Sequence, residues 1–139
     1  MKAILDLLGR VFLSAIFLYE AVDSFLYFEK TQEKMTLYGI TWQQDFLLTT
    51  SIFVLVLGGV LILTGYRAGF GAFLLLCYFF PLTLILHAFW QYPPGEQRGQ
   101  AIQLMHDLAI CGGLMLVLVN GAGKYSIKRI FSTIKVRRA

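Results

Sequence analysis

Five ionisable side chains within otherwise apolar stretches are the strongest candidates for chemistry in this sequence. Glu20 and Asp23 lie in the first apolar stretch, His87 lies near the end of the third, and His106 and Asp107 lie in the fourth. Counted at 1.5 Å per residue from the outer end of each predicted helix, all five fall ~5–12 Å below one membrane boundary. Ionisable groups inside membrane helices are costly and are usually paired or functional. The sequence therefore predicts one polar layer near the outer surface.

The spacing of these residues favours convergence on a common centre. Glu20 and Asp23 are three residues apart, so both carboxylates lie on one face of the first helix. His106 and Asp107 are adjacent and about 100° apart on a helix, so only one of them can point squarely at that centre. Gln103 shares a face with both and is a further polar candidate.

Three interpretations of the layer remain open. His87, His106 and Glu20 suit a divalent transition metal such as Zn, Fe, Mn or Cu. All five residues together suit a quinone pocket, in which a His–carboxylate pair takes or gives the proton that accompanies electron transfer. The third interpretation is an interhelical hydrogen-bond network that fixes packing. The sequence carries no HExxH motif or other tight metal-ligand spacing, so the pattern alone does not decide between them.

The elements that must position these residues are long apolar runs. The chain of 139 residues is 58% hydrophobic and 14% charged, whereas a soluble domain averages about 45–50% and about 25%. A run of ~20 apolar residues spans the hydrocarbon core as a helix. We predict an all-α, integral membrane four-helix bundle that forms a single domain over residues 1–139, with spans at about 4–28, 46–64, 70–90 and 101–119.

Small residues and cysteines within the spans indicate how they pack. Helices in lipid approach most closely at small residues, so Gly58–Gly59 and Gly112–Gly113 are predicted helix-crossing points. Cys77 and Cys111 both fall inside spans and belong to no CxxC motif. We expect buried, inert thiols and no disulfide.

The distribution of basic residues predicts the orientation. In a four-span arrangement, nine Lys and Arg residues lie on one side and three on the other, which places both termini in the cytoplasm. The net charge of +4 is thus a topology signal, and no nucleic-acid partner is expected. The nine are Lys2, Arg10, Arg67, Lys124, Lys128, Arg129, Lys135, Arg137 and Arg138, and the three are Lys30, Lys34 and Arg98.

Two further helices are predicted outside the spans. In the basic tail, residues 124–139, apolar side chains recur at helical spacing between Ile127 and Ile134, which is typical of an amphipathic helix on an anionic leaflet. The first loop, residues 29–45, is charged but neither Gly-rich nor Pro-rich. It is expected to hold a short helix on the outer face.

Several segments, in order, resemble the DoxX family of small bacterial membrane proteins. Leu8–Tyr19 resembles the family's opening, with a Gly-Arg pair before an apolar helix, and Gly58–Arg67 resembles its second helix. Leu86–Trp90 resembles the end of the third helix, and Leu104–Gly113 and Gly121–Ser126 resemble the fourth helix and its exit. The similarity extends over nearly the whole chain, and the order and spacing of the segments support it more than any one motif.

The resemblance implies a multi-pass protein of the bacterial cytoplasmic (inner) membrane. Relatives are linked to quinone-coupled sulfur oxidation, terminal oxidases and thiol-redox defence, usually beside partner subunits. It thus implies a subunit associated with respiratory or redox chemistry, and, if the chain is an enzyme, an oxidoreductase subunit. The bilayer and other subunits or a second copy are the expected partners. A non-catalytic accessory subunit of a larger membrane complex is the alternative, and a chaperone-like or transport module is a third hypothesis.

The sequence departs from the common DoxX pattern at two places. Family members often carry Lys near Asp23–Ser24 and Glu near Ser51, and both charges are absent here. The resemblance therefore implies either that this member lacks a family site or that Glu20 and Asp23 take its place.

Overall fold

The computed structural model describes residues 1–123 and 125–126, in which helices are the only regular elements. Four of these helices are long and two are short. In chain order they are α1 (Lys2–Leu26), α2 (Phe28–Leu37), α3 (Gln44–Thr64), α4 (Ala68–Leu86), the 3-10 turn η1 (Phe89–Gln91) and α5 (Pro94–Asn120). The predicted all-α class is confirmed. The predicted amphipathic helix in the tail lies outside the described residues, apart from Tyr125 and Ser126.

The long helices match the thickness of a membrane. α3, the stretch Ala68–Gln91 and α5 contain 21, 24 and 27 residues and are apolar enough to cross a bilayer. At 1.5 Å per residue each reaches the ~30 Å of a hydrocarbon core. α1 and α2 pass the same test only as a pair, with a bend of 97° between them. The described chain thus has three candidate spans, or four when the bent pair counts as one.

The helix ends differ from the predicted span ends at two places. Within the third span, which is predicted to reach Trp90, α4 ends at Leu86 and the chain turns into η1, and the candidate span Ala68–Gln91 contains both. The Tyr92 hydroxyl donates to the Leu86 carbonyl at 3.2 Å and replaces a helix hydrogen bond there. α5 begins at Pro94, within the predicted loop, because proline suits the first turn of a helix. The short helix expected in the first loop is confirmed as α2 and already begins at Phe28.

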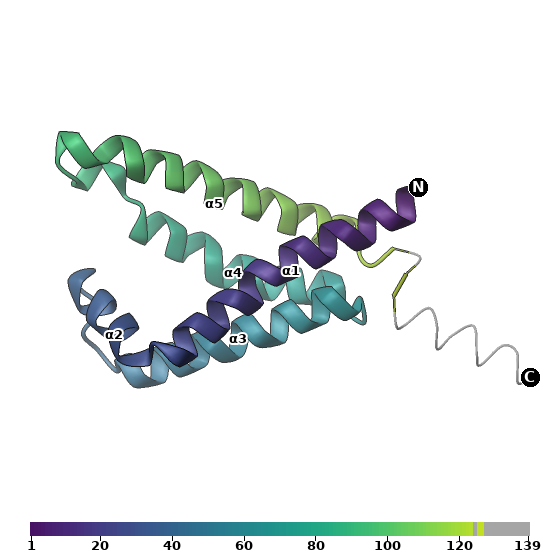
Figure 1. Ribbon diagram of the computed structural model, residues 1–139, viewed down its shortest axis with the longest axis horizontal. Helices are drawn as coiled ribbons and strands as arrows, with labels where there is room; N and C mark the ends of the chain where they lie inside the picture. Colours follow the sequence, from purple (N-terminus) through teal and green to yellow (C-terminus); the bar gives the residue numbers. More distant parts are fainter. Residues whose placement is uncertain (124, 127–139) are drawn as a thin grey trace, which may run out of the picture.

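Each long helix packs mainly on the next one in space, in the order α1, α3, α4, α5. α1 and α5 touch each other much less, and they diverge towards the end of the molecule where α2 and η1 lie (Figure 1). We call this end the α2 end and the opposite one the N-terminal end. The arrangement leaves wide helix faces in contact with lipid and a seam between α1 and α5.

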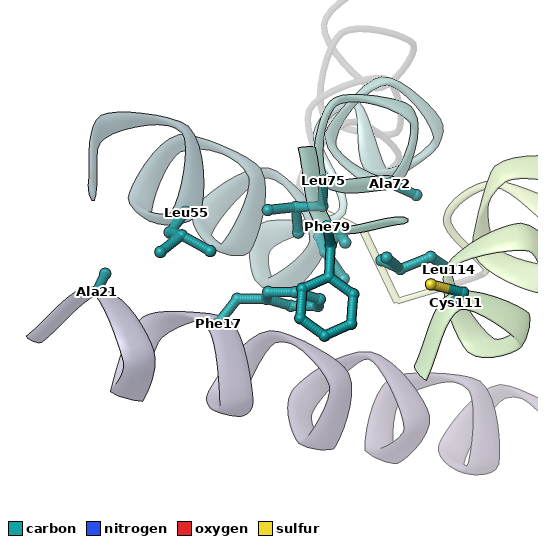
Figure 2. Close-up of a cluster of buried hydrophobic side chains, with 9 residues drawn as sticks. Phe17, Ala21, Leu55, Ala72, Leu75, Phe79, Cys111 and Leu114 are labelled. Carbon is teal, nitrogen blue, oxygen red and sulfur yellow. The ribbon is translucent and has the colours of Figure 1, made fainter. Parts of the chain in front are cut away.

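One apolar cluster joins all four long helices. Phe17 of α1 meets Phe79 of α4 edge-on, with 5.4 Å between ring centroids. Leu55 of α3 and Leu114 of α5 close the cluster on either side, and none of the four side chains is more than 8% exposed (Figure 2).

Three of the four paired glycines lie where two helices approach each other closely, as predicted. Gly58 lies against Leu75 of α4, and Gly59 against Leu18 of α1, so closely that an added Cβ would overlap either leucine. Gly113 faces Leu13 of α1, and an added Cβ would lie 3.3 Å from it. Gly112 has nothing within 4 Å, so it is not a crossing point.

The two cysteines differ in burial. Cys111 is 2% exposed within the apolar cluster, as predicted. Cys77 is exposed on α4, so the prediction of two buried thiols was wrong for this residue. In lipid, an apolar side chain gains little by facing protein rather than acyl chains, so apolarity alone does not predict burial.

A buried arginine closes the N-terminal end. Arg10 is 1% exposed and donates to the Asp6 carboxylate at 3.2 Å, to the Ile62 carbonyl at 3.3 Å and to the Tyr125 carbonyl at 2.5 Å. Asp6 also accepts from the Gly123 N–H at 3.2 Å. Arg10 thus forms an intrahelical pair with Asp6, and its guanidinium does not extend outward to the surface. It ties α1 to the end of α3 and to the segment after α5.

Candidate functional site

A histidine–carboxylate pair lies between α4 and α5. His87 Nε2 is 3.4 Å from an Asp107 carboxylate oxygen, and its Nδ1 is 2.8 Å from Gln100 Oε1. Thr83, one turn before His87, donates to the same Asp107 oxygen at 3.3 Å. Asp107 is 8% exposed and Thr83 2% exposed, so the group is shielded by the two helices. The prediction that His87 and Asp107 belong together agrees with this geometry.

The contacts of His87 place its ring between two polar partners. Gln100 Oε1 lies against Nδ1, and an Asp107 carboxylate oxygen lies against Nε2. With its hydrogen on Nδ1 the ring donates to Gln100, and with its hydrogen on Nε2 it donates to Asp107. A histidine beside a carboxylate is an arrangement that serves proton transfer in many proteins.

Glu20 and Asp23 line a separate pocket of about 320 Å³ beneath α2, which we call the Glu20 pocket. Its polar lining comes from four helices: Glu20, Asp23 and Ser24 of α1, Lys34 of α2, Ser51 of α3 and Tyr78 of α4. The Tyr78 hydroxyl interacts with Ser51. Leucines of α3 and α4, together with Met35 and Ile40, form the apolar part of the wall. Carboxylates, hydroxyl groups and one ammonium group thus face a single space.

The His87–Asp107 pair and the Glu20 pocket lie on different faces of α4. Tyr78, Leu82 and Leu86, four residues apart, line the Glu20 pocket. Thr83 and His87, also four apart, face α5. Both Asp107 and Asp23 repel a charge on Glu20, which places the two groups within electrostatic range of each other. The predicted single layer is therefore divided into two neighbouring groups.

His106 belongs to neither group. Its side chain is exposed on α5, while its neighbour Asp107 points inward, as adjacent helical residues must. The predicted metal set of His87, His106 and Glu20 is not brought together. Across residues 1–123 and 125–126, no three His, Cys, Asp or Glu side chains are close enough to hold a metal ion.

Sequence reasoning missed several polar partners. Gln103, singled out beside His106, is exposed, whereas Gln100 contacts His87. Gln100 is seven residues before Asp107, two helical turns, so the shared face was a usable signal. Thr83 is likewise one turn from His87. Lys34 could not have been found from spacing, because the 97° bend before α2 is what brings it over the pocket.

Comparison with protein-family models shows to which family the chain belongs. The DoxX family model matches residues 5–88, more than half of the sequence. The chain belongs to the DoxX family. The SURF4 family model matches residues 50–130, which overlap the DoxX match from residue 50 to residue 88. No curated protein and no solved structure matches. The chain is thus a small, multi-pass integral membrane protein in contact with lipid.

The DoxX match covers the two groups unequally. All residues that line the Glu20 pocket fall within it, whereas Gln100 and Asp107 lie only in the SURF4 match. Ser24 and Ser51 both line the Glu20 pocket. The charged residues at this pocket are Lys34, Glu20 and Asp23.

Proposed function

We propose that this DoxX-family protein is a redox-associated membrane subunit that binds a quinone headgroup in the Glu20 pocket. In this proposal the His87–Asp107 pair exchanges protons with that pocket. The observation that supports it most is the contact between His87 and Asp107 near a pocket that contains carboxylates, hydroxyls and an apolar wall.

The lining of the pocket fits a quinone in size and in polarity. A volume of about 320 Å³ is in the range of sites for small organic ligands. A quinone ring is flat and apolar and needs hydrogen-bond donors at its two carbonyl oxygens. Tyr78 and Lys34 supply such donors from two helices, whereas the Ser51 hydroxyl already donates to the Leu47 carbonyl.

The chain's own residues would handle the protons. A bound quinone supplies two-electron chemistry and takes up two protons on reduction, and a partner subunit would supply the electrons. Glu20 lies in the pocket wall and can give or take a proton there. Asp107 lies within electrostatic range of Glu20 and 3.4 Å from His87 Nε2. In this proposal the pair is the proton source that replaces a proton lost from Glu20.

The test separates binding from proton transfer. The protein is isolated from native membranes in mild detergent, and the extracted lipid is assayed for quinone against a protein-free control. Tyr78→Phe should weaken the binding of a short-chain quinone about fivefold, because it removes one neutral hydrogen-bond donor worth about 1 kcal/mol from the pocket. His87→Ala should leave the affinity unchanged and shift the pH profile of quinone reduction in the native complex.

His106→Ala is the matched control, because it removes the same side chain from an exposed site in the same helical layer. It should change neither the affinity nor the pH profile. The proposal fails if the isolated protein contains no quinone above the control. It also fails if His106→Ala shifts the pH profile as far as His87→Ala does.

The proposal includes a cellular setting. We place both termini in the cytoplasm and the chain in the bacterial inner membrane, in agreement with the nine-to-three distribution of basic residues. We also treat residues 1–139 as one DoxX-like domain. The overlapping family matches, which together cover residues 5–130, support a single unit.

A non-catalytic accessory subunit is the second candidate. It is favoured by the seam between α1 and α5 and by the small buried share of the candidate spans, 22–28%. Such faces suit another subunit or a second copy as well as lipid. Co-purification with a large membrane complex, without quinone, would support this candidate over the first.

A further inference from the structure

A second hollow, of about 790 Å³, lies at the α2 end between α2 and the segment from α4 to η1. We call it the α2–η1 hollow. It does not include Glu20 or His87, and it shares only Lys34 and Tyr38 with the Glu20 pocket. Its volume is within the range of about 300–1,000 Å³ that is typical of sites for drug-sized molecules.

The lining of this hollow is amphipathic. Lys34, Tyr38 and Tyr92 form a polar side, and the phenols of the two tyrosines are within hydrogen-bonding reach of each other. Leu84 and Ile85 form an apolar side, and they are 37% and 55% exposed. Lys34 is the one charged residue among the described residues that line it. An occupant must therefore be negative or electron-rich at one end and apolar at the other.

The hollow lies where a lipid headgroup would lie. α1 is 25 residues long, enough to cross the hydrocarbon core, and α2 leaves it at 97°. If α1 crosses the membrane, α2 therefore runs along the membrane surface. Tyr38, Trp90 and Tyr92 surround the hollow at this level, as aromatic residues do at headgroup depth.

We propose that the α2–η1 hollow is a binding site for an anionic phospholipid. The phosphate is held by Lys34 and the phenol of Tyr38, while the Tyr92 hydroxyl donates to the Leu86 carbonyl, and an acyl chain lies along Leu84 and Ile85. A lysine near a membrane surface favours anionic lipid by about fivefold. A free phosphate would use the polar side alone and leave the apolar side uncovered, so the lipid is the better fit.

Trp90 lies in the hollow and reports on its occupant. The chain has two tryptophans, so Trp42→Phe leaves Trp90 as the sole indole. This variant is reconstituted into phosphatidylcholine vesicles that contain phosphatidylglycerol, with bromine on the acyl chains of one lipid or the other. Brominated phosphatidylglycerol should quench Trp90 as expected for about fivefold preferential binding. Brominated phosphatidylcholine should quench it correspondingly less.

Substitutions of lysine in α2 test the charge. Lys34→Gln should bring the preference to about one, and Lys34→Arg should keep it, which excludes misfolding as the cause. Lys30→Gln is the matched control, since Lys30 has the same charge on the same helix but lies over the Tyr27 ring, 5.2 Å from its centroid. It should leave the preference unchanged.

Four results would overturn the proposal. The first is equal quenching of Trp90 by the two brominated lipids. The second is an equal loss of preference in Lys30→Gln and Lys34→Gln. The third is removal of the preference by added inorganic phosphate, which would identify a free anion as the ligand. The fourth comes from Trp90→Phe, which leaves Trp42 as the reporter outside the hollow. Quenching of Trp42 should show no preference for phosphatidylglycerol. A preference there would reflect the bulk membrane and would count against the site.

Discussion

Replacement of Arg10 by methionine should destabilise the protein strongly, although Arg10 lies far from both polar groups at the α2 end. Its guanidinium is 1% exposed and donates to one carboxylate and two carbonyl groups. Methionine keeps the length and the apolar stem of the side chain and removes all three hydrogen bonds. The Ile62 and Tyr125 carbonyls then lose their charged donor, and Asp6 loses its cation.

The magnitude follows from two limits. Removal of one partner from a buried ion pair costs about 3–5 kcal/mol in soluble proteins. Here the Asp6 side chain is 30% exposed and still accepts from the Gly123 N–H, so the upper limit is not reached. Hydrogen bonds between membrane helices average about 0.6 kcal/mol, so three of them set a lower limit near 2 kcal/mol. We expect a loss of about 2–4 kcal/mol in the free energy of unfolding.

Reversible unfolding in mixed detergent and SDS measures this loss directly. Arg67→Met is the matched control, because Arg67 is an exposed arginine in the turn between α3 and α4, and its replacement should change stability by less than about 0.5 kcal/mol. Amide exchange should also accelerate at Tyr125 and Ser126, since the Arg10–Tyr125 bond holds this segment to α1. If both arginine variants unfold alike, Arg10 does not hold the N-terminal end together.

Two further predictions concern packing. Gly71→Ala should lower the free energy of unfolding by about 1–3 kcal/mol, because its Cβ would lie 2.9 Å from the Gly58 carbonyl oxygen. Gly112 has nothing within 4 Å, so Gly112→Ala should be neutral or slightly stabilising in the same unfolding assay. A membrane-soluble maleimide should label the exposed Cys77 well before Cys111, which is 2% exposed. Mass spectrometry of the labelled peptides measures both reactions, and equal labelling of the two cysteines would contradict this packing.

The helices could be predicted because their signals are local. Apolar runs of about 20 residues and close approaches at Gly58–Gly59 depend on composition and spacing, which a sequence displays directly. The ends of α4 and α5 were less predictable. A tyrosine hydroxyl six residues downstream closes α4, and nothing in the apolar pattern signals that contact. The direction of α2 depends on the bend after Leu26, which hydrophobicity does not encode.

The depth of the candidate-site residues in the membrane was predictable, but the direction in which each side chain points was not. Counting residues along helices placed the five ionisable groups in one layer, since depth depends only on the rise per residue. Which neighbour each group faces depends on the rotation of every helix about its axis. Two membrane helices, α1 and α5, barely meet at this level, so Glu20 and Asp107 lie in different groups although they share the layer. Rotation also directs His106 outward.

The position of α2 connects the two proposed binding sites. Lys34 and Tyr38 line both the Glu20 pocket and the α2–η1 hollow. None of the residues of α2 is buried. Two side-chain hydrogen bonds join α2 to the segment that follows it, and both are at the surface: Gln44 donates to Thr36, and Gln32 donates to Asp45. Exposed bonds of this kind contribute little, so the chain itself holds α2 weakly. A lipid that binds Lys34 in the hollow would therefore also fix the wall of the Glu20 pocket. On this argument the affinity of that pocket for its ligand depends on the anionic lipid content of the membrane.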